Sequence, residues 1–294
     1  MADVARSAMS DPLLVVDAPS LLFRAFYALP DSITDGEGLP VNALLGTTNL
    51  ILLELERRPA RAVVLCFGEE AATYRTELYE PYHADREPPP DALDAQFAAA
   101  PDFFDALGWT TLVAADVEPD DVLGSLARIE TEAGGETLIL TGDRDMFQCA
   151  SDSVTVLYLR SGSRGADVVD PDEVRKRYGV SPELVPDFIA LRGDPSDGLP
   201  GGKGIGEKTA ADLLHRHGSL EGALAGWTGE TPRVRAALHD QADELRDFKD
   251  IATLLELDLE RPPDRPTDFR GGAAAARKRG MNRLAERLEM LADD

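Results

Sequence analysis

Short apolar runs alternate with longer amphipathic segments along the first half of the chain. The short runs are typical of buried parallel strands, which we expect at 13–17, 62–67, 111–113, 137–140 and 154–157. Apolar residues at helical spacing predict helices at 21–29, 41–56, 91–107 and 119–133, and the proline-containing segment from residue 69 to the third helix is expected to be irregular. The alternation predicts an α/β domain over residues 11–170, built on a mostly parallel sheet with flanking helices.

The second part of the chain has a different pattern. No strand-like run follows residue 170, and the remaining segments are typical of helices, so we expect a mainly helical region over residues 171–290. A proline-rich connector at 258–267 interrupts this region. Residues 270–287, after the connector, hold six basic residues and only one acidic residue.

Acidic residues recur where the predicted strands end or the following helices begin. Ligands of open α/β sheets collect beyond the carboxyl ends of the strands, so we expect these side chains to share one cleft. Each one alone is also compatible with a helix cap or a turn, but together they would repel strongly unless cations neutralised them. Oxygen ligands favour hard cations, which predicts two Mg²⁺ or Mn²⁺ ions able to hold and hydrolyse a phosphodiester. The predicted ligands are Asp17, Glu118, Asp120, Asp121, Asp143, Asp145, Asp194 and Asp197.

A glycine-rich turn follows the last two of these carboxylates, within the segment 193–210. The turn leads into a predicted helix at 207, so unpaired backbone N–H groups would face outward and suit a phosphate. Glycine lets a ligand approach the backbone closely and permits positive φ angles. The residues expected to bind phosphate here are Gly202, Lys203, Gly204, Gly206 and Lys208.

The joined sequence GDPSDGLPGGKGIGEKTA resembles the helix-hairpin-helix segment of the 5′-nuclease family, which includes the 5′→3′ exonuclease domain of bacterial DNA polymerase I and the flap endonucleases. The resemblance runs through LLVVDAPSLLFRAFYAL, YRTELYEPYHADR, EPDDVLGSLA and TGDRDMFQ to the final NRLAERLEM. It implies a PIN-like catalytic domain, a helical DNA-binding region, and a metal-dependent 5′→3′ exonuclease or flap endonuclease acting on DNA with a free 5′ end, flap or nick. The matched region ends where the family's nuclease gives way to a polymerase, so we expect a separate DNA polymerase as partner.

The resemblance also implies roles for individual residues. The first four predicted carboxylates along the chain would serve chiefly one metal ion and the last four chiefly the other, some of them through water. Three arginines match basic positions that face phosphates in the family: Arg24 and Arg86, which we expect to act in catalysis, and Arg75, which we expect to bind DNA. Gly204 and Gly206 match the turn that holds the duplex backbone, often with a monovalent cation such as K⁺.

Two positions depart from the family's pattern. Gly68 stands where an aspartate usually follows the second strand, so one ligand of the first metal is absent, and Glu69 or Glu70 is a candidate to replace it. We therefore expect Gly68→Asp to lower the metal concentration needed for activity. His83 follows Tyr82 where the family has a lysine that stabilises the scissile phosphate. His83 could take this catalytic role only when protonated, and a neutral structural histidine is the alternative.

The composition opposes part of this interpretation. The chain of 294 residues has a net charge of −24, and residues 69–102 hold nine acidic residues against two arginines, whereas phosphate binding needs positive charge. Two alternatives stay open: a DNA-binding member of the family without useful catalysis, and a hydrolase directed at RNA. The two cysteines, Cys66 and Cys149, are typical of reduced structural thiols, and no apolar run of membrane length or secretory signal is evident, so we expect a cytoplasmic protein.

Overall fold

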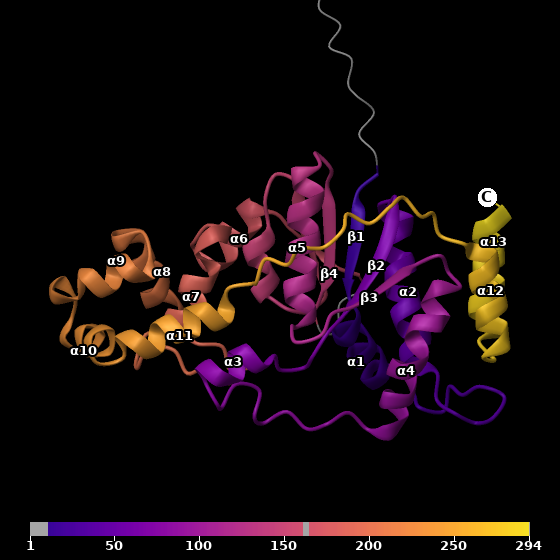
Figure 1. The fold of residues 1–294 in the computed structure, drawn as a ribbon, viewed down its shortest axis with the longest axis horizontal. Coiled ribbons are helices and arrows are strands. Elements are labelled where there is room, and N and C mark those ends of the chain that lie inside the picture. The colour runs from indigo at the N-terminus through magenta and orange to yellow at the C-terminus, as the bar shows by residue number, and fades with distance from the viewer. Residues whose placement is uncertain (1–10, 161–164, 294) are drawn as a thin grey trace, which may run out of the picture.

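The strands form a six-stranded sheet in the order β3-β2-β1-β4-β5-β6 (Figure 1). The computed structural model describes residues 11–160 and 165–293. Strands β1 to β5 run parallel and β6 is antiparallel to β5, which confirms the expected mostly parallel sheet. The short β6 was not predicted, because three residues at an edge give too little pattern. The strands are β1 (Leu13–Asp17), β2 (Ala62–Phe67), β3 (Thr110–Val113), β4 (Thr137–Thr141), β5 (Val154–Tyr158) and β6 (Asp167–Val169).

The strand order creates a topological switch between β1 and β4. From β1 the chain builds outward through β2 to β3, and then returns to add β4 on the other side of β1. Leu13 therefore pairs with both Ala62 and Thr137. The segments that follow β1 and β4 pack on opposite faces of the sheet, which opens a crevice at the carboxyl ends of these strands. Asp17 ends β1 and Asp143 follows β4, so both lie at this crevice.

Alternate strand residues serve two cores, one on each face of the sheet. Leu13 and Val15 pack into the first core, while Leu14 and Val16 pack into the second. The first core continues from α5 (Pro119–Glu132) into the helices of the second region: α6 (Pro171–Tyr178), α7 (Val185–Arg192), α8 (Glu207–His217), α9 (Leu220–Ala225), α10 (Pro232–Asp240) and α11 (Ala242–Ala252). The second core lies under α1 (Ala18–Ala28), α2 (Asn42–Arg57), α4 (Asp91–Asp105), α12 (Phe269–Lys278) and α13 (Asn282–Asp293).

The last two helices do not belong with the rest of the helical region. Residues 253–268 cross the molecule from α11 to α12, and α12 and α13 pack beside α4 at the opposite end (Figure 1). Ala276 and Leu288 join the core under α1 and α2 because the connector carries them back to the sheet. Arg61 fixes the connector: its Nη1 donates to the Pro262 carbonyl at 2.8 Å, and its guanidinium pairs with the buried Glu130. The predicted region 171–290 is therefore divided between two places in the fold.

Two smaller features complete the comparison with the sequence. The connection between β2 and α4 is not wholly irregular, because residues Thr73–Leu78 form the short helix α3. Burial raises the pKa of the Cys149 thiol to about 12 and raises that of Cys66 as well, and both cysteines are free. Within residues 11–160 and 165–293, no helix combines the length and apolar character needed to cross a membrane.

Candidate metal and nucleic-acid site

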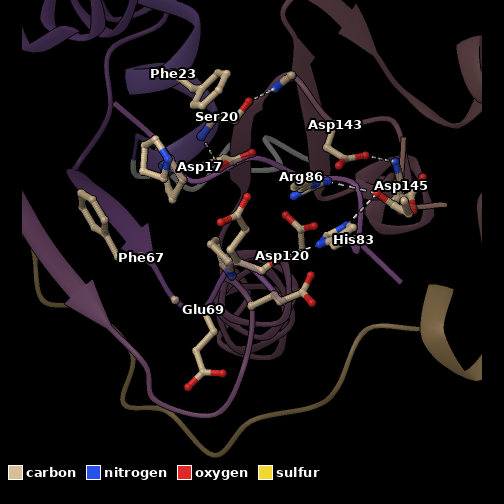
Figure 2. A pocket seen from close by; sticks show the side chains of 18 of the residues that line it. Asp17, Ser20, Phe23, Phe67, Glu69, His83, Arg86, Asp120, Asp143 and Asp145 are labelled. Atoms are coloured by element: carbon tan, nitrogen blue, oxygen red, sulfur yellow. Dashed lines mark hydrogen bonds and ion pairs between the residues drawn. The ribbon is translucent and has the colours of Figure 1, made fainter. Parts of the chain in front are cut away.

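Most of the predicted metal ligands line one cavity of about 1180 Å³ at the carboxyl ends of the central strands (Figure 2). They come from the end of β1, the loop after β4, the start of α5 and the loop after α7, and the connection between β2 and α4 forms another part of the wall. The crevice at the switch point is thus where side chains far apart in sequence meet. The predicted ligands that line it are Asp17, Glu118, Asp120, Asp143, Asp145 and Asp197, and Glu69, Glu70 and Glu87 line it as well.

Asp17 is fixed from both sides of the crevice. The Thr141 hydroxyl at the end of β4 donates to Asp17 Oδ2 at 2.7 Å, and the Ser20 N–H donates to Oδ1 at 3.1 Å, so Asp17 also caps α1. The Thr141 oxygen accepts a further hydrogen bond from the N–H of Asp143 at 2.9 Å. One hydroxyl therefore sets the positions of two carboxylates across the switch point. Sequence reasoning missed Thr141, since a threonine ending a strand is too common to signal this role.

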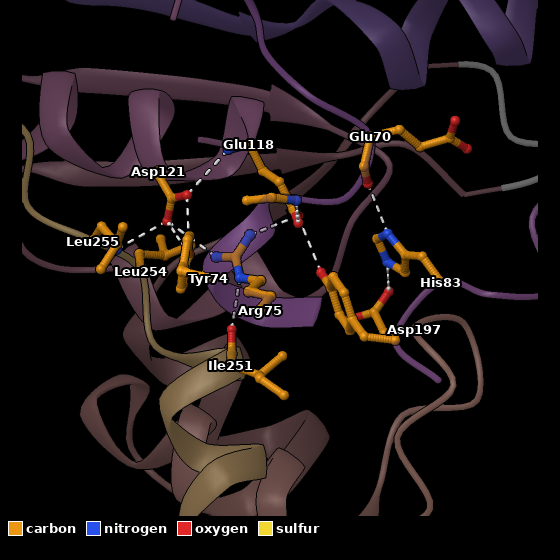
Figure 3. A network of polar contacts seen from close by, with 12 residues as sticks. Glu70, Tyr74, Arg75, His83, Glu118, Asp121, Asp197, Ile251, Leu254 and Leu255 are labelled. Carbon is orange, nitrogen blue, oxygen red and sulfur yellow. Dashed lines mark hydrogen bonds and ion pairs between the residues drawn. The ribbon is translucent and has the colours of Figure 1, made fainter. Parts of the chain in front are cut away.

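Asp121 is turned away from the cavity into the interior, where it is fully buried (Figure 3). Its carboxylate accepts hydrogen bonds from Arg75 Nη2 at 3.0 Å, from the N–H of Leu255 at 2.9 Å and from the N–H of Glu118 at 3.2 Å. The Tyr74 hydroxyl lies 3.2 Å from Oδ2. Asp121 thus joins α5 to α3 and to the connector. This position differs from the predicted one, because donors already surround the carboxylate and it does not line the cavity.

Arg75, which we expect to bind DNA, lines the cavity, but its guanidinium is directed at buried carboxylates. Its Nη1 is 2.6 Å from Glu118 Oε2, its Nη2 bonds Asp121, and its Nε donates to the Ile251 carbonyl at 2.9 Å. The residue is only 2% exposed. Burial would lower the pKa of Arg75, but the two carboxylates outweigh it and raise the pKa, so the guanidinium stays charged. Its charge therefore neutralises buried carboxylates at the start of α5.

Asp197 faces two basic side chains from the connection between β2 and α4. Its Oδ1 lies 3.0 Å from His83 Nε2 (Figure 3) and 3.3 Å from Arg86 Nη2. Burial would raise the pKa of Asp197, but the hydrogen bond from His83 and the charges of His83 and Arg86 outweigh it, and the pKa is lowered. Asp194 is buried and does not line the cavity; its Oδ2 accepts from Arg192 Nη2 at 2.8 Å, while its Oδ1 accepts from the Ser196 N–H. Asp194 shapes the loop that presents Asp197.

His83 sits between two acceptors. Its Nδ1 is 2.7 Å from the Glu70 carbonyl oxygen, and its Nε2 faces Asp197 (Figure 3). Both hydrogen bonds form together only when both ring nitrogens carry protons. The ring stacks on Tyr82, whose hydroxyl donates to Glu118 at 3.0 Å. The cation that would form is therefore directed at a carboxylate, and it links the connection to the loop after α7.

Arg24 lines the cavity from α1 but is held by backbone. Its guanidinium donates to the carbonyls of Leu159 and Arg160, the two residues that follow β5. Burial lowers the pKa of Arg24 from its ordinary value. The side chain thus brings positive charge to the rim of the cavity, and the acceptors of these hydrogen bonds are backbone carbonyls and not carboxylates.

The backbone around Gly68 explains why a glycine follows β2. A Cβ placed there would lie 2.6 Å from the Val117 carbonyl oxygen and 2.9 Å from Pro119 N. The strand end and the start of α5 are therefore packed backbone to backbone. The nearby Glu69 points away from Asp17 and Asp143, with its Oε1 accepting from the Asp116 N–H at 3.3 Å (Figure 2). This orientation gives no support to replacement of the absent ligand by Glu69.

The electrostatics of the cavity fit hard divalent cations. Burial, followed by repulsion from Asp197, raises the pKa of Asp143 to about 7. Burial and the charge of Asp143 likewise raise the pKa values of Asp120 and Asp145, and burial raises that of Asp17. All these donors are oxygens, and nearby arginines among the described residues compensate their charges only in part, which is the environment that Mg²⁺ or Mn²⁺ would stabilise. Within the described residues, no three such groups are close enough together to hold an ion in this arrangement.

The glycine-rich turn lies apart from the cavity, at the start of α8. Gly204 has a φ of +81°, which favours glycine, and no atom lies within 4 Å of the side-chain position of Gly206. Lys203 is exposed, and its N–H donates to Gln241 Oε1 at 2.8 Å, whereas Lys208 pairs with Asp212. Gly202 packs against Ile205, within the turn. The predicted phosphate-binding residues are therefore together, at a second location.

An aromatic surface at the cavity mouth had no part in the sequence prediction. Phe23 and Tyr27 project from α1, 46% and 63% exposed, with ring centroids 4.9 Å apart. They line the cavity together with Phe67 and Phe97. The helical spacing of residues 23 and 27 puts both rings on one face, which was a usable signal. Exposed aromatic rings beside cations are suited to stacking with unpaired nucleobases.

Two family models match the chain. Residues 12–179 match the 5′-3′ exonuclease N-terminal resolvase-like domain, and residues 180–267 match the 5′-3′ exonuclease C-terminal SAM fold. The thermostable DNA polymerase I of Thermus thermophilus is 37% identical over 281 residues, and the DNA polymerase I of Mycobacterium tuberculosis is 38% identical over 243 residues. These alignments cover 94% and 80% of this chain but 32% and 27% of those proteins. The chain therefore spans about a third of the length of the curated relatives it matches.

Solved structures share the fold. The T5 5′-exonuclease with bound zinc has a TM-score of 0.66 at 16% identity and covers 95% of this chain and 99% of its own. The catalytic core of Rad2 in complex with DNA substrate has a TM-score of 0.64 at 13% identity, with coverage of 96% and 92%. At these identities the likeness shows a common fold.

Proposed function

Since this chain belongs to the 5′-3′ exonuclease family, we propose that it hydrolyses DNA phosphodiesters from a free 5′ end, a flap or a nick, with divalent metal ions in the acidic cavity. The observation that carries the proposal is that six of the eight predicted ligands line one cavity at the switch point of the sheet. Burial raises the pKa values of four of them, Asp17, Asp120, Asp143 and Asp145, which indicates negative charge that nearby cations among the described residues balance only in part. These four make no ion pair with an arginine among the described residues, whereas Glu118 pairs with Arg75, Asp197 pairs with Arg86 and the structural Glu130 pairs with Arg61 and Arg261.

The residues fall into two groups around the cavity. Asp17, Glu118 and Asp120 would hold one Mg²⁺ or Mn²⁺ ion, and the loop carboxylates at 143, 145 and 197 would hold the other. Such ions supply Lewis-acid chemistry and lower the pKa of bound water. Asp121 and Asp194 act behind these groups by fixing the start of α5 and the loop after α7.

The remaining residues of the cavity would position the DNA strand. Arg86 and Arg24 place positive charge at the rim, where a phosphate would otherwise meet only carboxylates. Phe23 and Tyr27 offer stacking surfaces for the bases of an unpaired end. The turn around Gly204 would bind the duplex backbone, with K⁺ as the candidate cation there, so duplex and scissile phosphate would be held at separate places. The catalytic unit would span residues 11–170 and the DNA-binding unit residues 171–290, with bounds near those of the two family models at 12–179 and 180–267.

A DNA-binding protein without useful catalysis is the second candidate. His83 and Arg86 both bond Asp197, and the position after β2 offers no carboxylate because backbone packing leaves no room for a side chain. Both features would weaken metal binding. Since its relatives are DNA polymerase I proteins, we propose that the chain works beside a DNA polymerase, in the cytoplasm, in either case.

A cleavage assay separates these functions. Labelled DNA with a 5′ flap, a nick or a single-stranded 5′ end would be incubated with Mn²⁺, with Mg²⁺, or with EDTA. We expect release of short 5′ products with either metal and none with EDTA. Binding without cleavage at every metal concentration would favour the second candidate. Faster cleavage of a matched RNA end would redirect the proposal to RNA.

A further inference from the structure

A few basic side chains remain without an acidic partner in this acidic protein. Most lysines and arginines within residues 11–160 and 165–293 make an ion pair, as Arg216 does with Glu230 and Arg246 does with Glu221. Lys203 and Arg233 make neither an ion pair nor a side-chain hydrogen bond among these residues, and both are exposed. In a chain with a net charge of −24, two such cations at one turn need an explanation.

Arg233 lies directly on the glycine-rich turn. A Cβ built on Gly204 would overlap the guanidinium of Arg233. The guanidinium therefore occupies the space that a side chain at position 204 would fill. Glycine at position 204 therefore permits a φ of +81° and also leaves space for the Arg233 side chain. It lets a residue from α10, 29 positions later in the sequence, lay its charge against the turn.

The helix that carries Arg233 is firmly placed relative to the turn. Val234 and Leu238 of α10 are buried in the same core as Ile205. At the end of α10, Gln241 Oε1 accepts the hydrogen bond from the Lys203 N–H at 2.8 Å. Both ends of α10 therefore contact the turn or its neighbours in the core. Core packing of α10, and not only the conformation of the exposed side chain, places the Arg233 guanidinium beside the turn.

We propose that Arg233 is a phosphate-binding residue of the duplex-binding surface, supplied by α10 and absent from the hairpin motif itself. A guanidinium presents several N–H donors in one plane and matches two phosphate oxygens better than an ammonium does. Beside Lys203 it provides local positive charge that opposes the long-range repulsion between DNA and an acidic protein. The proposal rests on the proposed function only in taking duplex DNA as the ligand.

Fluorescence anisotropy with a labelled blunt DNA duplex tests the proposal, in EDTA so that no cleavage occurs. Binding would be measured between about 50 and 200 mM salt. Loss of one phosphate contact makes the slope of log K against log salt less steep by about 0.9. Over that salt range, wild-type affinity should therefore fall by a factor about three- to four-fold larger than the factor by which the affinity of Arg233→Ala falls. At the lowest salt we expect Arg233→Ala to bind several-fold more weakly, with Arg233→Lys in between.

Arg246→Ala is the matched control, because Arg246 is an exposed arginine of the same helical region whose charge is neutralised by Glu221 and Asp243. We expect its salt slope to equal that of wild type. An unchanged slope in Arg233→Ala, or an equal loss in both variants, would overturn the assignment, as would a wild-type protein that binds no duplex. Wild-type binding without cleavage in Mn²⁺ would refute the proposed hydrolysis and leave the role of Arg233 intact.

Discussion

Asp120 and Asp121 are neighbours in sequence, yet the structure predicts opposite effects on stability when each is changed to asparagine. Asp121 accepts hydrogen bonds from Arg75, Leu255 and Glu118, with Tyr74 close by. An amide in its place must direct an NH₂ group at one of these donors. Asp120 lines the cavity, and burial together with the charges of Asp143 and Asp17 raises its pKa.

The expected magnitude for Asp121→Asn follows from its burial. Breaking a buried ion pair by removing one partner costs about 3–5 kcal/mol. Glu118 still pairs with Arg75 in this variant, so we expect the lower end, about 3 kcal/mol. For a protein of this size each kcal/mol lowers Tm by roughly 2–4 °C, which gives a loss of roughly 6–12 °C. Asp120→Asn removes a repelling charge and should raise the Tm of the metal-free protein.

Thermal unfolding in EDTA at neutral pH, followed by circular dichroism, measures both shifts. Mn²⁺ titration of the two variants provides the second measurement. We expect Asp120→Asn to weaken Mn²⁺ binding strongly, and Asp121→Asn to weaken it less while still reducing cleavage through displacement of α5. Equal Tm shifts of the same sign would refute this reasoning, and so would an Asp121→Asn protein as stable as wild type.

Three further predictions follow from the same geometry. Because burial raises the pKa of Asp143 to about 7, the ionisation of Asp143 should destabilise the metal-free protein as pH rises from about 4 through 7. Asp143→Asn should flatten this part of the profile of Tm against pH, and Mn²⁺ should restore the Tm of wild type above about pH 7. A variant whose profile equals that of wild type would contradict the assignment. Gly68→Asp should lower the free energy of unfolding in urea by about 1–3 kcal/mol, because a Cβ would meet the Val117 carbonyl and Pro119. This destabilisation replaces the expectation that Gly68→Asp lowers the metal concentration needed for activity. An unchanged urea midpoint together with tighter Mn²⁺ binding would restore that expectation. Tyr27→Ala should weaken binding of a single-stranded 5′ end by about 1–3 kcal/mol while leaving blunt duplex binding unchanged, and equal losses on both DNAs in an anisotropy assay would argue against base stacking.

The order of elements was readable from the sequence because local pattern decides it. Continuous apolar runs such as 13–17 and 62–67 can be buried on both faces only as central parallel strands, and the structure has them there. Asp17 after β1 and Asp143 after β4 lie at one edge of the sheet, since parallel strands share their carboxyl ends, whereas Asp121 and Asp194 do not line the cavity there. Weak patterns failed: β6 and α3 are short, and their neighbours rather than their own residues stabilise them.

Which acid does what depended on contacts between distant segments. Asp120 and Asp121 carry the same functional group, but one faces a cavity and the other meets Arg75 and Leu255, residues 46 positions before it and 134 after it. The backbone contact that requires Gly68, and the arginine of α10 that covers Gly204, are likewise invisible to spacing along the chain. Sequence periodicity reports which face of an element is buried. The partner of each charged group is decided only when the elements pack, because exposed charges separated by more than about 10 Å are largely screened by salt.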